Sequence, residues 1–199
     1  MIKRTNILTK MALMAALQCI ISPFAITFPI SPVPISLATL MLYLSIYILG
    51  KKHATISCGI YLLIGLVGIP VFSGFTGGVG KLLGPTGGYL IGYPALTFIG
   101  GWCVEKWSSR VSSVNGVGVM EKDRVDKLGL FMQGLGLALG TAACYLFGSL
   151  WLSYQTGMDF VAALGVGVVP FVPGDVVKIA IGVVVGNAIR RRLVKAGVV

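Results

Sequence analysis

The chain has 199 residues, of which 56% are hydrophobic and 11% are charged, and its mean hydropathy is +0.92. Soluble domains carry about 25% charged residues, so the composition argues against a soluble enzyme and excludes a disordered chain. The net charge of +10 comes from basic residues clustered between apolar runs, which is typical of membrane topology signals and not of nucleic-acid binding. We therefore expect an all-α integral membrane protein with one transmembrane domain over residues 1–199.

Six apolar segments follow one another along the chain and predict six transmembrane helices. We expect these helices at residues 7–23, 35–49, 54–69, 89–104, 128–154 and 171–189. The second segment is short for a full crossing, so it is expected to tilt little or to begin inside a re-entrant loop. The first segment is expected to be a permanent span, since no small-residue cleavage site precedes a polar mature domain.

The basic residues predict the orientation of these helices. With a cytoplasmic N-terminus, fourteen of the sixteen Lys and Arg residues fall in cytoplasmic segments. Of the other two, Lys81 falls in an outside loop and Lys178 within the last span. Cytoplasmic loops of membrane proteins carry such an excess of Lys and Arg. We therefore expect a multi-pass protein of the cell membrane with both termini in the cytoplasm.

The loops assigned to the outside are apolar. Residues 23–34 contain four prolines and no charge, and residues 69–89 combine many glycines with large apolar side chains. Irregular backbone at membrane depth must be buried in protein or line a cavity, and glycine lets the backbone approach a ligand closely. The segment 69–89 is therefore predicted to be a folded cap and not a solvated linker, whereas the polar segment 108–127 predicts a cytoplasmic connector.

Asp175 and Lys178 are the most informative charged residues. They lie three positions apart in the last apolar segment, on one face of the expected helix, and Pro173 and Gly174 place Asp175 near its start. An ionisable side chain inside a span costs about 2.5–3.5 kcal/mol on insertion scales, which makes it a functional hypothesis. The pair predicts a polar ligand site facing the outside half of the bundle; the alternative is an internal ion pair that only fixes packing.

Other chemistry can be tested against the residues present. Intramembrane aspartyl proteolysis needs two facing aspartates, and the other outward aspartate, Asp159, falls in a loop. The single histidine, His53, is expected at a cytoplasmic helix start, so neither a zinc-protease motif nor a Ser/His/Asp triad is present. The four cysteines are isolated and are expected to be small buried hydrophobes. We expect no enzyme, metal or cofactor.

Small residues four positions apart allow helices to approach closely. Gly136 with Gly140 and Gly182 with Gly186 are expected to pack within the bundle. The pair Ala12 and Ala16 in the first helix is expected either to pack there or to face a partner protein.

At several motifs the chain resembles the BioY family, the biotin-specific substrate-binding (S) components of energy-coupling factor (ECF) transporters. The resemblance covers nearly the whole chain, and Ala38 departs from it where the family is expected to carry glutamine. The motifs are Val33-Pro34-Ile35-Ser36-Leu37-Ala38-Thr39, Pro70-Val71-Phe72-Ser73-Gly74, Gly77-Gly78, Gly84-Pro85-Thr86-Gly87-Gly88-Tyr89 and Pro173-Gly174-Asp175 followed by Lys178.

The resemblance implies a six-helix S-component fold whose glycine-rich external loop caps the ligand site. It implies capture of biotin at the external face, with ATP hydrolysis supplied by two cytoplasmic ATPases and a transmembrane coupling protein that docks on Ala12 and Ala16. We expect Lys178 to neutralise the biotin carboxylate and Asp175 to accept ureido N–H bonds or orient Lys178, although these roles could be exchanged. The rest of the predicted site is Thr39, Phe72, Gly77, Gly78, Tyr89 and Tyr93. An S component for another vitamin and a membrane-embedded enzyme are the alternatives.

Overall fold

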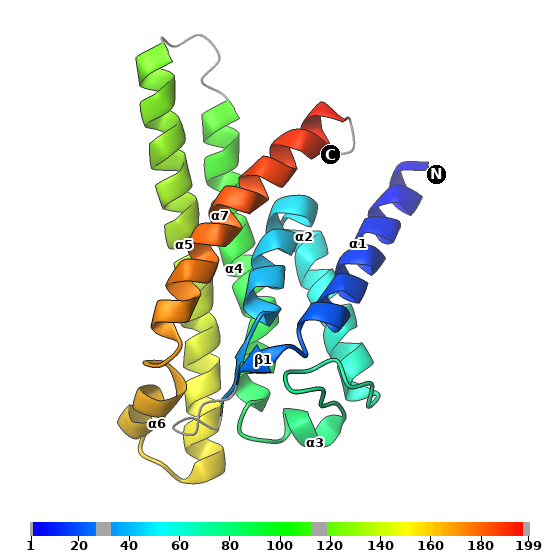
Figure 1. Cartoon of the computed structure of the whole chain (residues 1–199), viewed down its shortest axis with the longest axis vertical. Helices are drawn as coiled ribbons and strands as arrows, with labels where there is room; N and C mark the ends of the chain where they lie inside the picture. The colour runs from blue at the N-terminus through cyan, green and yellow to red at the C-terminus, as the bar shows by residue number, and fades with distance from the viewer. Residues whose placement is uncertain (1, 27–32, 113–118, 197–199) are drawn as a thin grey trace.

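The computed structural model describes residues 2–26, 33–112 and 119–196. Most of the described residues lie in long helices (Figure 1). The other elements are two short helices and a pair of antiparallel strands of two residues each. In chain order the elements are α1 (Ile2–Ile21), β1 (Ala25–Ile26), β2 (Ile35–Ser36), α2 (Ala38–Leu66), α3 (Val79–Leu82), α4 (Gly87–Ser112), α5 (Val119–Thr156), α6 (Phe160–Gly167) and α7 (Val172–Lys195).

Helix α2 consists of two arms that meet at Gly50, where the backbone has φ 73° and ψ 170°. Glycine adopts this left-handed conformation without the penalty that a Cβ brings. The bend is fixed by Glu105 of α4, whose Oε1 accepts a hydrogen bond of 2.7 Å from the Lys51 N–H, and whose Oε2 lies 3.5 Å from Lys51 Nζ. The two arms correspond to the second and third predicted helices, and each of the other predicted helices overlaps α1, α4, α5 or α7.

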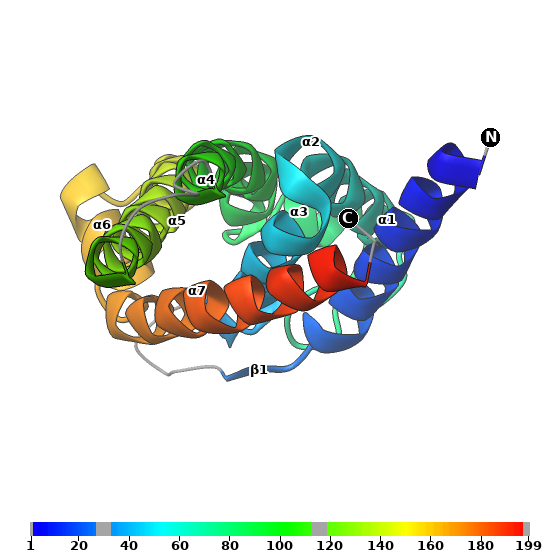
Figure 2. The ribbon, with the colours of Figure 1, turned by 90° about the horizontal axis from the view of Figure 1, so that it is seen from above.

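The helices alternate in direction between two ends of the molecule (Figure 1). The start of α1, the bend of α2 and the end of α7 lie at one end, together with the end of α4 and the start of α5. The β1–β2 hairpin, α3 and α6 lie at the opposite end. Seen along the bundle, α4 packs on α5 and α2, while α1 and α7 each pack against α2 (Figure 2). The ends predicted to be cytoplasmic are therefore brought together.

Two details differ from the expected elements. Helices α4 and α5 run into the segment 108–127, which was expected to be a plain connector. Five of the nine residues 119–127 are Met, Glu, Lys or Arg, which favour helix. Among the described residues, two helices meet the length and hydropathy of a membrane span on their own: Lys127–Thr156 and Val172–Val194. The bend at Gly50 divides α2 into arms that are each shorter than a standard span.

The paired glycines pack within the bundle, as predicted. A Cβ at Gly136 would overlap Cys103 of α4, and a Cβ at Gly140 would lie 2.8 Å from the Leu96 carbonyl oxygen. On α7, a Cβ at Gly182 would lie 3.0 Å from Tyr43 Cβ, and one at Gly186 would overlap the Tyr47 ring. All four cysteines lie among the described residues and are free; Cys58 and Cys144 are buried in the core, as predicted, whereas Cys19 and Cys103 are only half-buried.

Candidate ligand-binding site

The first turn of α7 carries both charged residues of the predicted site. Val172 and Pro173 begin the helix, and the fixed φ of proline suits the first helical turn. Asp175 lies in this turn, where the positive end of the helix dipole favours a carboxylate. Lys178 follows one turn later and its Nζ lies 2.9 Å from Asp175 Oδ1. The two side chains are only 12% and 8% exposed, so the ion pair is largely removed from solvent.

The Lys178 ammonium group connects α7 to the start of α2. Besides Asp175, it donates to the Ser36 carbonyl oxygen at 2.8 Å and to Thr39 Oγ1 at 3.3 Å. An ammonium group has three protons, and each has an acceptor here. A ligand carboxylate that binds Lys178 therefore replaces one of these acceptors, and the long contact to Thr39 is the weakest of the three.

The Asp175 carboxylate is held by donors from three helices. Lys178 and Thr39 donate to Oδ1, the latter at 3.4 Å, and the Tyr145 hydroxyl of α5 donates to Oδ2. A carboxylate offers about four lone-pair positions. Three are taken, so Oδ2 retains capacity for one further N–H donor.

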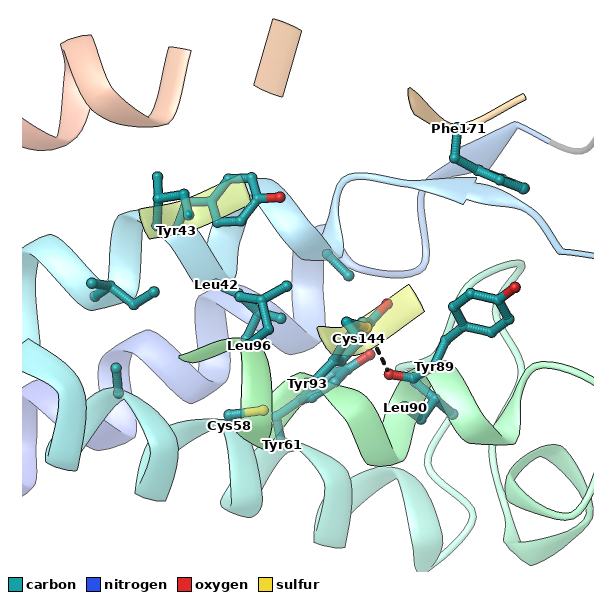
Figure 3. Close-up of a cluster of buried hydrophobic side chains, with 14 of the residues drawn as sticks. Leu42, Tyr43, Cys58, Tyr61, Tyr89, Leu90, Tyr93, Leu96, Cys144 and Phe171 are labelled. Atoms are coloured by element: carbon teal, nitrogen blue, oxygen red, sulfur yellow. Dashed lines mark hydrogen bonds between the residues drawn. The ribbon is translucent and has the colours of Figure 1, made fainter. Parts of the chain in front are cut away.

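These groups line a cavity of about 50 Å³ at the end of the bundle that carries the hairpin and α6. Aromatic side chains from α4, α5 and the α6–α7 connection line it. Figure 3 shows Tyr89 and Tyr93 on either side of Cys144, and Phe171 on a separate segment above Tyr89. Cys144 Sγ donates to the Tyr89 carbonyl oxygen at 3.4 Å, and Tyr89 Oη donates to the Gly167 carbonyl oxygen at 2.8 Å. The lining residues are Val33, Pro34, Ser36, Thr39, Tyr89, Tyr93, Thr141, Cys144, Tyr145, Phe171, Asp175 and Lys178.

The structure brings five of the predicted site residues together in this lining: Thr39, Tyr89, Tyr93, Asp175 and Lys178. Phe72, Gly77 and Gly78 lie elsewhere, in the glycine-rich loop. The Phe72 ring is fully buried against Gly65 and packs edge-on to Tyr61, with ring centroids 5.6 Å apart.

Gly77 and Gly78 bring the backbone of this loop close to α2 and to the residues that follow it. Gly78 has φ 87° and donates to the Gly65 carbonyl oxygen at 2.7 Å, and a Cβ at Gly77 would overlap the Ile69 carbonyl oxygen. Phe72 and Gly78 therefore hold the loop against the end of α2, and Gly77 packs on the residues that follow the helix. Contact of these three residues with a ligand stays a prediction. Lys81 lies on α3 in the same loop, where partial burial lowers the pKa of its ammonium group.

Ala12 and Ala16 lie on an exposed face of α1, whereas Met11, Met14 and Ala15 form its buried face. The two alanines therefore do not pack within the bundle in the way that the paired glycines do. Contact with a partner protein stays a prediction.

Sequence reasoning missed the contribution of α5 to the site. Thr141 and Tyr145 line the cavity and are hydrogen-bonded, and they lie four residues apart in an apolar helix. That spacing of hydroxyl side chains was a usable signal, because polar groups on one face of a membrane helix point to a polar interior. Ser36 contributes its backbone carbonyl, which its side-chain type does not reveal.

The fold and the candidate site point to a class of protein: a helical membrane bundle with a small cavity near one end, lined by aromatic rings and a buried ion pair. A solved structure of this class, the S-component for biotin from an ECF-type ABC transporter, matches 95% of this chain and 93% of its own. The TM-score is 0.80 at 30% sequence identity. The chain belongs to the BioY family, whose model matches residues 2–195.

Curated relatives agree with this assignment. The biotin transporter BioY of Thermotoga maritima is 32% identical over 170 residues, which cover 83% of this chain and 86% of the relative. The probable biotin transporter BioY of Pyrococcus horikoshii is 34% identical over 165 residues, which cover 83% and 85%. The biotin transporter BioY2 of Lactococcus lactis is 31% identical over 186 residues, which cover 94% and 91%.

Proposed function

We propose that this chain captures biotin at the external face of the cell membrane as the substrate-binding subunit of an ECF transporter. The observation that carries the proposal is the buried pair of Asp175 and Lys178, which lines a cavity in a fold shared with the S-component for biotin. The names of the relatives favour biotin over another vitamin. They also favour transport over a membrane-embedded enzyme.

The chemistry of biotin matches the groups in the cavity. Biotin has a carboxylate, a ureido group with two N–H donors, and an apolar tail and thioether ring. Lys178 supplies a cation for the carboxylate, and charge-assisted hydrogen bonds of this kind are the strong ones. Asp175 orients the Lys178 ammonium group, whose Nζ lies 2.9 Å from Asp175 Oδ1. Thr39, Tyr89 and Tyr93 complete the polar and aromatic contacts, and we keep Phe72, Gly77 and Gly78 as residues of the cap over the bound ligand.

The topology that goes with this function has six spans in a single transmembrane domain over residues 1–199, with both termini in the cytoplasm. The distribution of basic residues supports this orientation. The ligand cavity then opens toward the outside. Energy for uptake comes from two ATPase subunits acting through a transmembrane coupling protein, and the exposed Ala12 and Ala16 provide the docking face for that protein.

Equilibrium binding of radiolabelled biotin to the purified chain in detergent tests the proposal. We expect saturable binding with one biotin per chain that an excess of other water-soluble vitamins does not displace. Uptake of the label by cells that express the chain with the coupling protein and ATPases is expected to exceed uptake by cells with an ATPase variant unable to hydrolyse ATP. Displacement by another vitamin, or absence of saturable binding, contradicts the proposal.

A further inference from the structure

A second hollow reaches the ligand site from the side of the bundle. A groove of about 130 Å³ lies between α5 and α7, and its lining residues are spaced three and four positions apart, on one face of each helix. They are Ala138, Thr141, Ala142, Tyr145, Val172, Asp175, Val176 and Ile179. Thr141, Tyr145 and Asp175 also line the ligand cavity. These three residues therefore separate the cavity from the groove.

Hydrogen bonds from three helices fix this partition. The Tyr145 hydroxyl donates to Asp175 Oδ2, which joins α5 to α7. One turn earlier on α5, Thr141 Oγ1 lies 2.6 Å from Tyr43 Oη of α2 and donates to the Leu137 carbonyl oxygen at 2.8 Å. Because a threonine hydroxyl has one proton, Tyr43 is the donor in its contact with Thr141. The partition is thus tied to both neighbouring helices.

The groove beyond the partition is apolar. Its outer walls are alanines on α5 and branched aliphatic residues on α7, and Val176 is 60% exposed. The polar atoms at its inner end are already paired, since Tyr145 donates to Asp175 and Thr141 to Leu137. The groove therefore suits an alkyl chain, and the Tyr145 ring stands between it and the ligand cavity.

We propose that Tyr145 positions Asp175 through its hydroxyl and limits ligand length through its ring. The inference rests on the proposed function, in which the biotin carboxylate binds Lys178. Lys178 Nζ lies 2.9 Å from Asp175 Oδ1, and Asp175 lines the groove, so a ligand tail that binds Lys178 ends beside the partition. Tyr145 then blocks any extension beyond the carboxylate.

A double-mutant cycle tests the positioning role. Tyr145→Phe keeps the ring and removes the hydroxyl, and we expect it to weaken biotin binding about 10- to 100-fold, the range for one hydrogen bond to a charged group. If Tyr145 acts through Asp175, adding Tyr145→Phe to Asp175→Asn changes the affinity less than threefold. Losses that multiply in the double variant, or a single Tyr145→Phe effect below threefold, overturn the positioning role. Competition with unlabelled biotin at concentrations up to millimolar allows the dissociation constants of the weakly binding variants to be measured.

An elongated ligand tests the steric role. The probes are the N-hexyl and N-methyl amides of biotin, and the measured quantity is the affinity of the hexyl amide divided by that of the methyl amide for the same variant. Both amides lack the carboxylate, so the ratio isolates the added chain. We expect Tyr145→Ala to raise this ratio at least tenfold, whereas Tyr145→Phe leaves it at the wild-type value. An unchanged ratio in Tyr145→Ala overturns the steric role.

Tyr154 provides the matched control, since it is on the same helix, is 82% exposed and lines neither the cavity nor the groove. Tyr154→Phe and Tyr154→Ala are expected to bind biotin and both amides as the wild type does. Biotin binding by the wild type separates the proposed function from the role of Tyr145. If the wild type does not bind biotin, the proposed function is refuted and the role of Tyr145 loses its basis. Biotin binding that is normal and indifferent to Tyr145 refutes only the further inference.

Discussion

Replacement of Lys178 by Met provides the most direct test of the site. Methionine keeps an unbranched apolar stem of similar length and removes the ammonium group, together with its bonds to Asp175, the Ser36 carbonyl and Thr39. Breaking a buried pair by removing one partner costs about 3–5 kcal/mol. At about 1.4 kcal/mol per factor of ten, a comparable loss on the ligand side weakens binding by roughly 100- to 3,000-fold.

The assay is equilibrium binding of radiolabelled biotin in detergent, together with the thermal unfolding midpoint of the same samples without ligand. Stability and binding are separated by the double variant Asp175→Asn, Lys178→Met, which removes both charges. We expect this variant to unfold at a higher temperature than Lys178→Met, because no uncompensated charge remains buried, while its biotin binding stays weak. Lys81→Met is the control, since Lys81 is a partly buried lysine of α3 outside the cavity lining. A biotin affinity of Lys178→Met within threefold of the wild type refutes the assigned role.

Two further predictions concern packing and partner contact. Gly186→Val is expected to destabilise the chain by about 1–3 kcal/mol, as overpacking does, because its side chain overlaps the Tyr47 ring; Gly174→Ala on the same helix meets no atom within 4 Å and is expected to leave the unfolding midpoint unchanged or raised. Ala16→Trp on the exposed face of α1 is expected to leave biotin binding unchanged and to reduce uptake that depends on the coupling protein. Ile56→Trp, at an exposed position of α2, serves as its control in the uptake assay, and equal uptake by both variants contradicts the docking role.

The positions of the long helices were predictable from the sequence. A long apolar segment in a membrane must pair its backbone N–H and C=O groups internally, and an α-helix does so. The bend of α2 also followed, since Lys51 and Lys52 interrupt an apolar stretch after Gly50. Helix α6 was not predicted, although Asp159 is its N-cap and accepts a hydrogen bond of 3.1 Å from the Val161 N–H. Its eight residues are too few for a span, so hydropathy over the length of a span does not reveal it.

The site was predictable in part, for the reason that charge in hydrocarbon is costly and therefore stands out. Asp175 and Lys178 were predicted on this ground, Thr39 and Tyr89 from motifs shared with the BioY family, and Tyr93 as an aromatic contact for biotin. Tyr145 was not predicted, because a tyrosine in an apolar helix is common and its partner lies thirty residues away in the chain. The Ser36 carbonyl was not predicted either, since every residue carries one.

What the sequence could not provide is the register between α2 and α7, on which the site depends. Three contacts define this register: Thr39 with Lys178, Tyr43 with Gly182, and Tyr47 with Gly186. Residues four positions apart on α2 therefore contact residues four positions apart on α7. The two glycines allow the helix backbones to approach closely. Because the same register runs through all three pairs, the contacts of Gly182 and Gly186 farther along α7 also place Lys178 against the start of α2. The glycine spacing and the charged pair, which look like separate motifs in the sequence, are therefore parts of one interface.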